Sequence, residues 1–285
     1  MIQPALTEDA FVADVAAAGR EPERLHVWWL GQSGFLVQWG GRRLLFDPYL
    51  SDSLTKKYAR TDKPHTRMSA RVVAPERLDF IDVVTSSHNH TDHLDAETLI
   101  PIMRRNPRLT FVIPEANRRF VAERLAVAPE SFRGLDAGQS LVVDGFEINA
   151  IPAAHETIER DEQGRCRFLG YVVKCGPWTL YHSGDTVHFD GMEAWLRRWE
   201  IDLAFLPING RAPERRVAGN LDGREAATLA KGAGIKIVIP CHYDMFEFNT
   251  ATPELFVATA TELEQDYVVL RQGERWSCQT AGALK

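Results

Sequence analysis

Three histidines and one aspartate are crowded into six consecutive positions, His88-Asn89-His90-Thr91-Asp92-His93. Because side chains alternate along an extended loop, we expect His88 and His90 to face the same side, with Asp92 and His93 reaching a neighbouring point. Imidazole and carboxylate groups together suit Zn²⁺ or Mn²⁺, with Fe²⁺ also compatible, and two ligand pairs suit two ions a few ångströms apart. The spacing predicts a metal centre; the alternative is a polar loop that merely contains many histidines.

The elements around this segment alternate in a way that repeats once along the chain. A helix at 7–18 precedes apolar strands at 27–30, 35–37 and 44–46, which open a β-meander. Further strands are expected at 81–84, 111–113, 140–143, 146–151, 168–174, 178–182, 203–208, 235–240 and 268–271. Helices are expected at 95–105, 115–126, 191–199, 223–233 and 254–264. Strands first and helices after, twice over, predict an α+β fold, an αββα sandwich of two packed β-sheets with outer helices.

The composition is that of a globular protein and excludes several functions. The 285 residues are 45% hydrophobic and 25% charged, and no Pro/Ser-rich linker divides them, so one domain over 1–285 is expected. A net charge of −6 argues against nucleic acid as a partner. No run approaches the roughly 20 apolar residues of a membrane helix, so no membrane partner is expected either. The four cysteines are scattered, which favours reduced thiols and a cytoplasmic location.

The HxHxDH motif after a strand resembles that of the metallo-β-lactamase superfamily of metal-dependent hydrolases. The resemblance implies three further ligands in chain order, and His155, Asp185 and His242 follow later strands in that order. It implies that His88, His90 and His155 hold the first ion, that Asp92, His93 and His242 hold the second, and that Asp185 bridges them. It also implies that Asp47, after the strand at 44–46, orients ligand histidines without binding an ion.

Strings in the second half of the chain resemble one branch of that superfamily, the L-ascorbate-6-phosphate lactonases. They are Leu206-Pro207-Ile208-Asn209-Gly210-Arg211, Gly219-Asn220-Leu221-Asp222 and Pro240-Cys241-His242-Tyr243-Asp244-Met245-Phe246-Glu247-Phe248-Asn249. The motif at 88–93 also resembles that of the N-acyl-phosphatidylethanolamine phospholipase D branch. The lactonase resemblance implies that a metal-bound hydroxide opens a small anionic sugar lactone, with or without a phosphate, while Asp92 or Asp185 orients the hydroxide and moves its proton. The alternatives are a phosphodiesterase of the same fold and a non-catalytic metal-binding scaffold.

A basic segment at about 51–75 follows Asp47. Its six cations against two carboxylates make a net charge of +4. The segment is either a solvated surface insertion or a lid that receives a small-molecule anionic substrate. The candidate substrate contacts are Lys56, Lys57 and Arg60, with Asn209, Arg211 and Tyr243 from the lactonase-like strings. The sequence leaves a homo-oligomer open.

Overall fold

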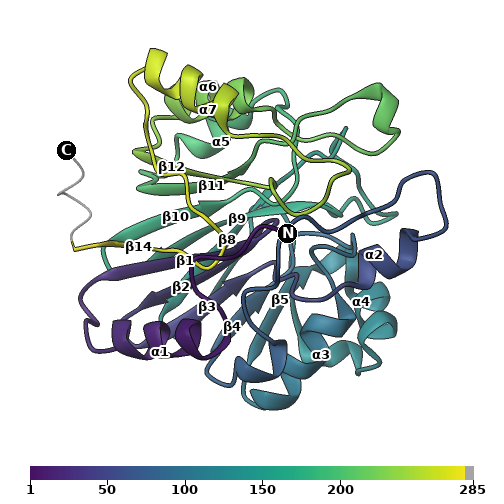
Figure 1. Cartoon of the computed structure of the whole chain (residues 1–285), viewed down its shortest axis with the longest axis vertical. Helices are drawn as coiled ribbons and strands as arrows, with labels where there is room; N and C mark the ends of the chain where they lie inside the picture. The colour runs from purple at the N-terminus through teal and green to yellow at the C-terminus, as the bar shows by residue number, and fades with distance from the viewer. Residues whose placement is uncertain (280–285) are drawn as a thin grey trace.

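Two seven-stranded β-sheets pack face to face, and helices cover both outer faces (Figure 1). The computed structural model describes residues 1–279. The first sheet has the order β14-β1-β2-β3-β4-β5-β6, and the second has the order β13-β12-β11-β10-β9-β8-β7. Figure 1 places α1, α3 and α4 outside the first sheet and α5, α6 and α7 outside the second. The predicted αββα sandwich is therefore confirmed.

The elements have the following bounds. The first sheet contains β1 (Leu25–Gly31), β2 (Gly34–Trp39), β3 (Arg42–Phe46), β4 (Val83–Thr85), β5 (Thr110–Pro114), β6 (Phe132–Leu135) and β14 (Arg275–Cys278). The second contains β7 (Ser140–Val143), β8 (Phe146–Pro152), β9 (Leu169–Cys175), β10 (Trp178–His182), β11 (Leu203–Pro207), β12 (Ile237–Cys241) and β13 (Asp266–Tyr267). The helices are α1 (Glu8–Ala18), α2 (Ser53–Tyr58), α3 (Ala96–Arg105), α4 (Arg118–Leu125), α5 (Met192–Leu196), α6 (Gly223–Ala233) and α7 (Glu254–Glu262).

Each sheet changes from antiparallel to parallel pairing at its centre. In the first sheet β1, β2 and β3 pair antiparallel, and β3 to β6 pair parallel. In the second sheet β7 to β10 pair antiparallel, and β10 to β13 pair parallel. Alternate strands of an antiparallel run point the same way, so β1 runs with β3 and β8 runs with β10. The loops after β1, β3 and β4 therefore open at one edge of the first sheet, and those after β8, β10 and β12 at one edge of the second.

Aromatic side chains join the two sheets across the interface. Phe35 on β2 stacks on Phe205 on β11 with ring centroids 4.2 Å apart. Phe46, at the end of β3, stacks on His182 of β10 at 4.8 Å. Burying such rings on both faces stabilises the pairing of the sheets and fixes their relative position. Both sheets contribute to one apolar core, which places their strand ends opposite each other.

The structure differs from the expected elements at several places. The strand expected at 268–271 is wrong: the chain pairs with β12 only over β13, and Val268 adds a single hydrogen bond to Val238 before the chain leaves the sheet edge. Three elements were not expected, namely α2, β6 and β14. All three are short, and β14 is a half-buried edge strand without an apolar run. Such segments give little periodic signal.

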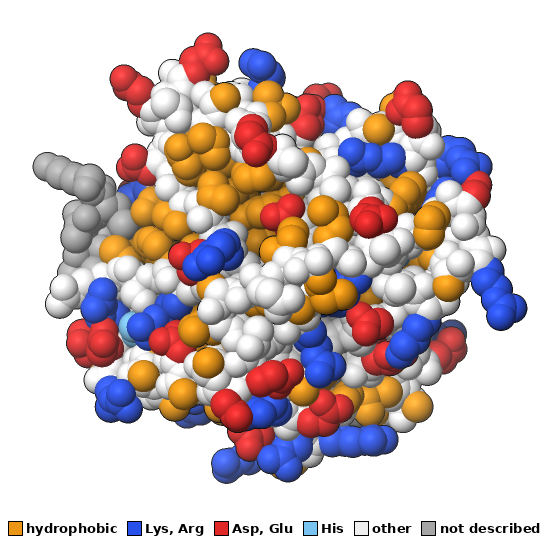
Figure 2. All heavy atoms as spheres, in the orientation of Figure 1, with side chains coloured by type: hydrophobic (Ala, Val, Ile, Leu, Met, Phe, Trp, Pro, Cys, Tyr) orange, Lys and Arg blue, Asp and Glu red, His pale blue; other side chains and the backbone are white. Residues whose placement is uncertain are grey.

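The outer surface is mixed in charge. Figure 2 shows Lys and Arg side chains interspersed with Asp and Glu over the face drawn, with apolar side chains gathered in the region where Figure 1 draws β12. Within residues 1–279, the helices are all too short or too polar to cross a membrane.

Candidate metal centre

The seven predicted ligands converge where strands of both sheets end. They form two groups in which the ligand atoms lie within 4.8 Å of one another, His88-His90-His155 and Asp92-His93-Asp185-His242. Residues 88–93 follow β4 of the first sheet, whereas the other three follow β8, β10 and β12 of the second. Each group therefore combines ligands from both sheets.

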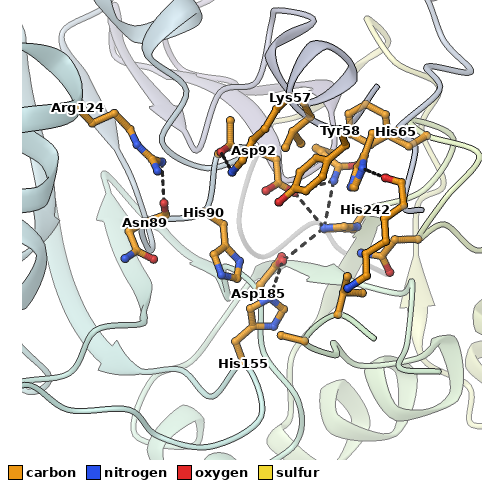
Figure 3. Close-up of a pocket in the computed structure, with 18 of the residues that line it drawn as sticks. Lys57, Tyr58, His65, Asn89, His90, Asp92, Arg124, His155, Asp185 and His242 are labelled. Carbon is orange, nitrogen blue, oxygen red and sulfur yellow. Dashed lines mark hydrogen bonds and ion pairs between the residues drawn. The ribbon is translucent and has the colours of Figure 1, made fainter. Parts of the chain in front are cut away.

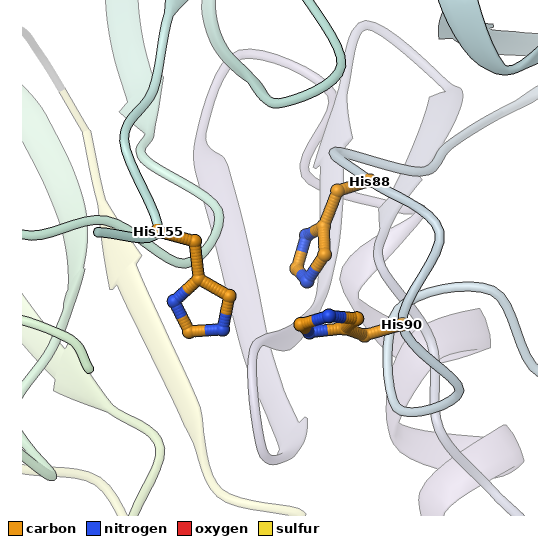
Figure 4. Close-up of side chains that lie close together, drawn as sticks. All are labelled: His88, His90 and His155. Atoms are coloured by element: carbon orange, nitrogen blue, oxygen red, sulfur yellow. The ribbon is translucent and has the colours of Figure 1, made fainter. Parts of the chain in front are cut away.

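The first group consists of three imidazole rings that point toward one another (Figure 4). The ring centroids of His88 and His90 are 4.7 Å apart, and those of His90 and His155 are 5.0 Å apart. His155 Nδ1 donates to the carbonyl oxygen of Gly219 at 2.7 Å, which leaves its Nε2 unprotonated when the ring is neutral. His88 Nε2 is buried and has no hydrogen-bond partner among the described residues. Its lone pair is free for an ion.

The second group alternates histidines with carboxylates. His93 Nε2 lies 3.2 Å from Asp185 Oδ1, and His242 Nε2 lies 3.4 Å from Asp185 Oδ2. The same Asp185 Oδ2 lies 3.6 Å from His155 Nε2 in the first group. Figure 3 shows Asp185 between His155 and His242, on the side of the cleft that His90 also faces. This is the position that a bridging carboxylate needs.

The donor set fits divalent ions. Burial opposes ionisation of Asp185, but His93 and His242 outweigh it and hold the pKa of the carboxyl well below its ordinary value. Burial likewise disfavours a charged His242, yet Asp185 and Asp92 raise its pKa to about 9. The protein thus keeps ionised carboxylates within about a hydrogen-bond length of imidazoles, in a group of which His93, Asp185 and His242 are buried. Imidazole nitrogens and carboxylate oxygens so arranged suit Zn²⁺, Mn²⁺ or Fe²⁺.

Asp47 faces the Nδ1 side of His93, and with His88 and His93 it forms a third group whose candidate ligand atoms lie within 4.8 Å of one another. It follows β3 with a φ of +38°, a left-handed conformation that is unfavourable for a residue with a side chain. Its buried carboxylate accepts from His93 Nδ1 at 2.7 Å, from the Ser87 amide at 3.0 Å and from the Ser87 hydroxyl. Ser87 Oγ in turn lies 2.9 Å from His88 Nδ1. Asp47 therefore orients one histidine of each group, one directly and one through Ser87.

A cleft of about 520 Å³ opens over the two groups (Figure 3). Its cationic side chains are Lys57, Lys63 and Arg124, and its only acidic lining residues in the described chain are Asp92 and Asp185. The remaining wall is mixed. Its apolar and aromatic residues are Leu54, Tyr58, Phe120, Val217, Ala218 and Phe246, and its polar residues include Gln32, His65, Asn89, Thr91 and Asn249. A volume of this size accommodates a small molecule.

The basic segment divides between the cleft and the surface. Lys57 lines the cleft, and its Nζ lies 3.4 Å from Thr91 Oγ1. Lys56, its neighbour on α2, lies outside the lining because its ammonium pairs with Glu97 at 2.7 Å on the exposed side of the helix. Arg60 is exposed and also lies outside the lining.

The other three predicted substrate contacts have partners within the protein. Arg211 pairs with Glu225 at 2.6 Å, outside the cleft lining. The buried Asn209 donates its amide to Asn249 Oδ1 at 3.1 Å. Tyr243 is buried, and its hydroxyl donates to the carbonyl of Leu270 at 2.6 Å. Packing thus turns these side chains toward internal partners rather than into the cleft.

The cleft is also lined by polar and charged residues that were not among the candidates, including Gln32, Lys63, His65 and Arg124. Gln32 follows the carboxyl end of β1, at the edge where the other site loops open, and this position is the one signal that could have identified it. His65 stacks on Tyr58 at 4.6 Å, and Arg124 donates to the carbonyl of Asn89 at 2.7 Å. The second contact joins residues 35 positions apart in the sequence.

Two loops meet beside the cleft. Arg216, on the segment after β11, pairs with Asp62, and its carbonyl oxygen accepts from Lys63 Nζ. The same segment ends at Gly219, whose carbonyl holds His155 and whose amide donates to Glu156 Oε1 at 2.8 Å. One wall of the cleft is thereby connected to a predicted ligand of the first group.

The fold and the site together define a metal-dependent hydrolase of the metallo-β-lactamase superfamily. The family described as Beta-lactamase superfamily domain matches residues 42–243 of the chain. The UPF0173 metal-dependent hydrolase of Pelotomaculum thermopropionicum is 31% identical over 84% of this chain and 95% of its own. The chain belongs to this family of metal-dependent hydrolases.

Solved structures show the same fold at lower identity. Igni18, a metallo hydrolase from the archaeon Ignicoccus hospitalis, has a TM-score of 0.66 at 22% identity, covering 90% of this chain and 98% of its own. The metallo-β-lactamase fold protein YhfI from Bacillus subtilis has a TM-score of 0.63 at 19% identity, covering 90% and 99%. At these identities the likeness concerns the fold alone.

Proposed function

We propose that the protein is a two-ion hydrolase that opens a small anionic sugar lactone, with or without a phosphate group, like the L-ascorbate-6-phosphate lactonases its strings resemble. One observation supports an anionic substrate. Three cationic side chains line the cleft over the ligand groups, and no described acidic residue lines it except Asp92 and Asp185. An anion bound there meets opposite charge in a partly desolvated site, where charge-assisted contacts are strong.

The residues divide into distinct roles. His88, His90 and His155 would hold one ion, Asp92, His93 and His242 would hold the other, and Asp185, which lies near histidines of both groups, would contribute to both. Zn²⁺ or Mn²⁺ bound there would supply a coordinated water with a pKa of about 7 and a Lewis acid for the substrate oxygen. Asp92 is the more open carboxylate, with 16% of its side chain exposed against 4% for Asp185. Asp92 is thus the better placed of the two to accept and return a proton at the cleft.

The walls of the cleft bind and orient the substrate. Lys57 and Lys63 approach from the basic segment, and Arg124 from α4. Phe120 and Phe246 supply apolar surface for the uncharged part of the molecule and exclude water from it. The short segment around α2 acts as the lid of this cleft.

The same proposal includes a reducing, cytoplasmic setting. Cys166, Cys175 and Cys241 are buried free thiols. Each is positioned as an apolar core side chain, which is the usual state of cysteine in a reducing compartment.

A substrate screen tests the proposal. Protein reconstituted with Zn²⁺ or Mn²⁺ is assayed against sugar lactones with and without a phosphate, beside phosphodiesters and β-lactams. We expect the anionic lactones to be hydrolysed with the highest kcat/KM. Faster turnover of phosphodiesters would instead identify the protein as a phosphodiesterase. The cationic side chains of the cleft would also suit the negative charge of such a substrate. Tight ion binding without turnover of any ester would favour a metal-binding scaffold.

A further inference from the structure

Gln32 lies at the tip of the turn between β1 and β2, at the edge where the site loops open. It is 3% exposed and has a φ of +48°. A left-handed backbone is unfavourable for glutamine and persists only where surrounding contacts hold it. Asp47 and His242, at φ +38° and +65°, share this conformation at the same site. Strained residues of this kind concentrate at functional positions.

The contacts of Gln32 join two residues of the second group. Its side-chain Nε2 lies 2.9 Å from Asp92 Oδ2 and 3.1 Å from His242 Nε2. Its carbonyl oxygen accepts from the backbone amide of His242 at 3.0 Å. Since an ionised carboxylate only accepts hydrogen bonds, Asp92 requires the NH₂ side of the amide to face it. Gln32 therefore holds the side chain of Asp92 and the main chain of His242 at once.

No other described residue outside the ligand groups donates to the Asp92 carboxylate. Asp92 is also the most exposed carboxylate of the site, so its loop restrains it less than packing restrains Asp185. Asp47 and Ser87 hold His93 and His88 from behind, but neither contacts Asp92 or His242. Asp47 thus orients one histidine of each group, and Gln32 contacts the two members of the second group that Asp47 does not reach, Asp92 and His242.

We propose that Gln32 is a positioning residue for the ion on the Asp92 side, holding Asp92 and His242 in the geometry that this ion requires. The proposal rests on the two-ion centre but not on the nature of the substrate. Outer contacts of this kind typically change metal affinity about 10–100-fold.

The test is a competition titration with a metal chelator on the full chain. Gln32→Met keeps the side-chain length and removes the donor. Gln32→Asn keeps an amide that is too short to reach Asp92, and asparagine tolerates a left-handed backbone better than most residues. Both variants should raise the dissociation constant of the Asp92-side ion by about 10–100-fold. The dissociation constant of the ion in the first group should change by no more than about twofold, since the side chain of Gln32 has no hydrogen bond to a residue of that group. His155→Ala and His242→Ala identify which constant belongs to which ion.

Gln265→Met is the matched control. Gln265 is also buried, and its Nε2 donates to the carbonyls of Ile235 and Lys236, away from the centre. Its substitution should lower thermal stability without changing either constant. Unchanged ion binding in both Gln32 variants, or an equal weakening of both ions, overturns the proposal. If the unaltered protein takes up one ion only, the two-ion centre fails, and the effect of Gln32→Asn on that single constant still decides the role of Gln32.

Discussion

At the scale of single residues, the histidines of the two groups differ in protonation. Burial and the neighbouring histidines lower the pKa of His88 well below 6.5, so this ring is neutral at pH 7. Burial also disfavours a charged His93, but Asp185 and Asp92 outweigh it and hold its pKa well above 6.5. His242 behaves like His93, with a pKa of about 9. In the second group, which contains Asp92 and Asp185, the histidines that would bind an ion therefore bind protons when no ion is present.

This difference predicts a proton release on metal binding. Without metal, His93 and His242 are both protonated at pH 7, and an ion on the Asp92 side must displace those protons. Affinity on that side should rise with pH up to about 9, by about tenfold per pH unit for each displaced proton. In the metal-free protein, the raised pKa values mean that these contacts add stability below pH 6.5. The contribution of His242 is lost as the pH rises through about 9, and that of His93 is lost as the pH rises through its own raised pKa.

Calorimetric titration in two buffers of different ionisation enthalpy measures the released protons. We expect up to two at pH 7 for the Asp92-side ion, and fewer near pH 9. Binding that is independent of buffer at pH 7 would contradict the assignment of charge to these two histidines.

A second prediction uses two adjacent lysines as a matched pair. Lys57 lines the cleft, while Lys56 pairs with Glu97 on the surface. Lys57→Gln should lower kcat/KM for an anionic lactone about tenfold to a hundredfold, because a charge-assisted contact is lost. A neutral lactone should be affected much less, and Lys56→Gln should change either rate by about twofold or less. Equal effects of the two substitutions would mean that the basic segment is a solvated surface insertion and not a lid that binds the substrate.

At the scale of elements, the centre depends on how closely the ends of β4 and β10 approach. Gly184 separates β10 from Asp185, with a φ of +59°. A Cβ built there would lie 2.5 Å from Ser87 Cβ, on the segment that follows β4. Ser87 hydrogen-bonds Asp47 and contacts His88, so displacing it disturbs both ligand groups. Glycine at this position permits the strand ends to meet.

Gly184→Ala should therefore reduce stability and metal content together. Gly40→Ala is the control, because Gly40 has nearly the same φ, +57°, but no atom within 4 Å of the new Cβ. The control should lose about 1–2 kcal/mol from backbone strain alone. Gly184→Ala should lose about 1–3 kcal/mol more from steric overlap. Urea unfolding measures the stability of the two variants, and elemental analysis measures their metal content. If both variants lost the same stability and Gly184→Ala kept its full metal content, the ends of β4 and β10 would tolerate the added methyl group.

At the scale of the whole molecule, each ligand group spans the two sheets. His88 and His90 come from the first sheet and His155 from the second, and the other group is divided in the same way. An ion in either group cross-links the halves of the sandwich in addition to the core contacts between Phe35 and Phe205. Metal binding should therefore stabilise the fold as a whole.

Removing the metal with a chelator should lower Tm by several degrees. An ion present at about 100 times its dissociation constant adds about 2.7 kcal/mol, if it binds only the folded chain. In a chain of this size each kcal/mol corresponds to roughly 2–4 °C. Adding Zn²⁺ or Mn²⁺ back should restore Tm, and Asp185→Ala should reduce the difference because it contacts both groups. A Tm that does not depend on metal would mean that the ions do not join the two halves.

Much of the architecture follows from local sequence. The alternation of strands and helices, repeated once, predicted the sandwich, because each element has a periodic pattern that is independent of distant residues. Short elements without such a pattern were missed, namely α2, β6 and β14. The edge strand β14 forms because β1 offers it a register from Leu25↔Cys278 to Trp28↔Arg275, a pairing across some 250 residues that no local pattern contains.

The sequence by itself supplied the seven candidate ligands, because four lie in one motif and the resemblance of that motif to the metallo-β-lactamase superfamily implies the other three after later strands. Only the tertiary structure decided which cations face the cleft. Lys56 and Lys57 are adjacent and chemically identical, but they project from different sides of α2, and the packing of that helix separates them. Gln32 lies in the turn between β1 and β2 and belongs to none of the sequence motifs. Its contact with Asp92 spans 60 positions and exists because β1 runs in the same direction as β3 and β4, which brings the loops after β1 and β4 to the same edge. Local spacing specifies which residues can bind a metal, whereas strand register and helix packing specify their neighbours.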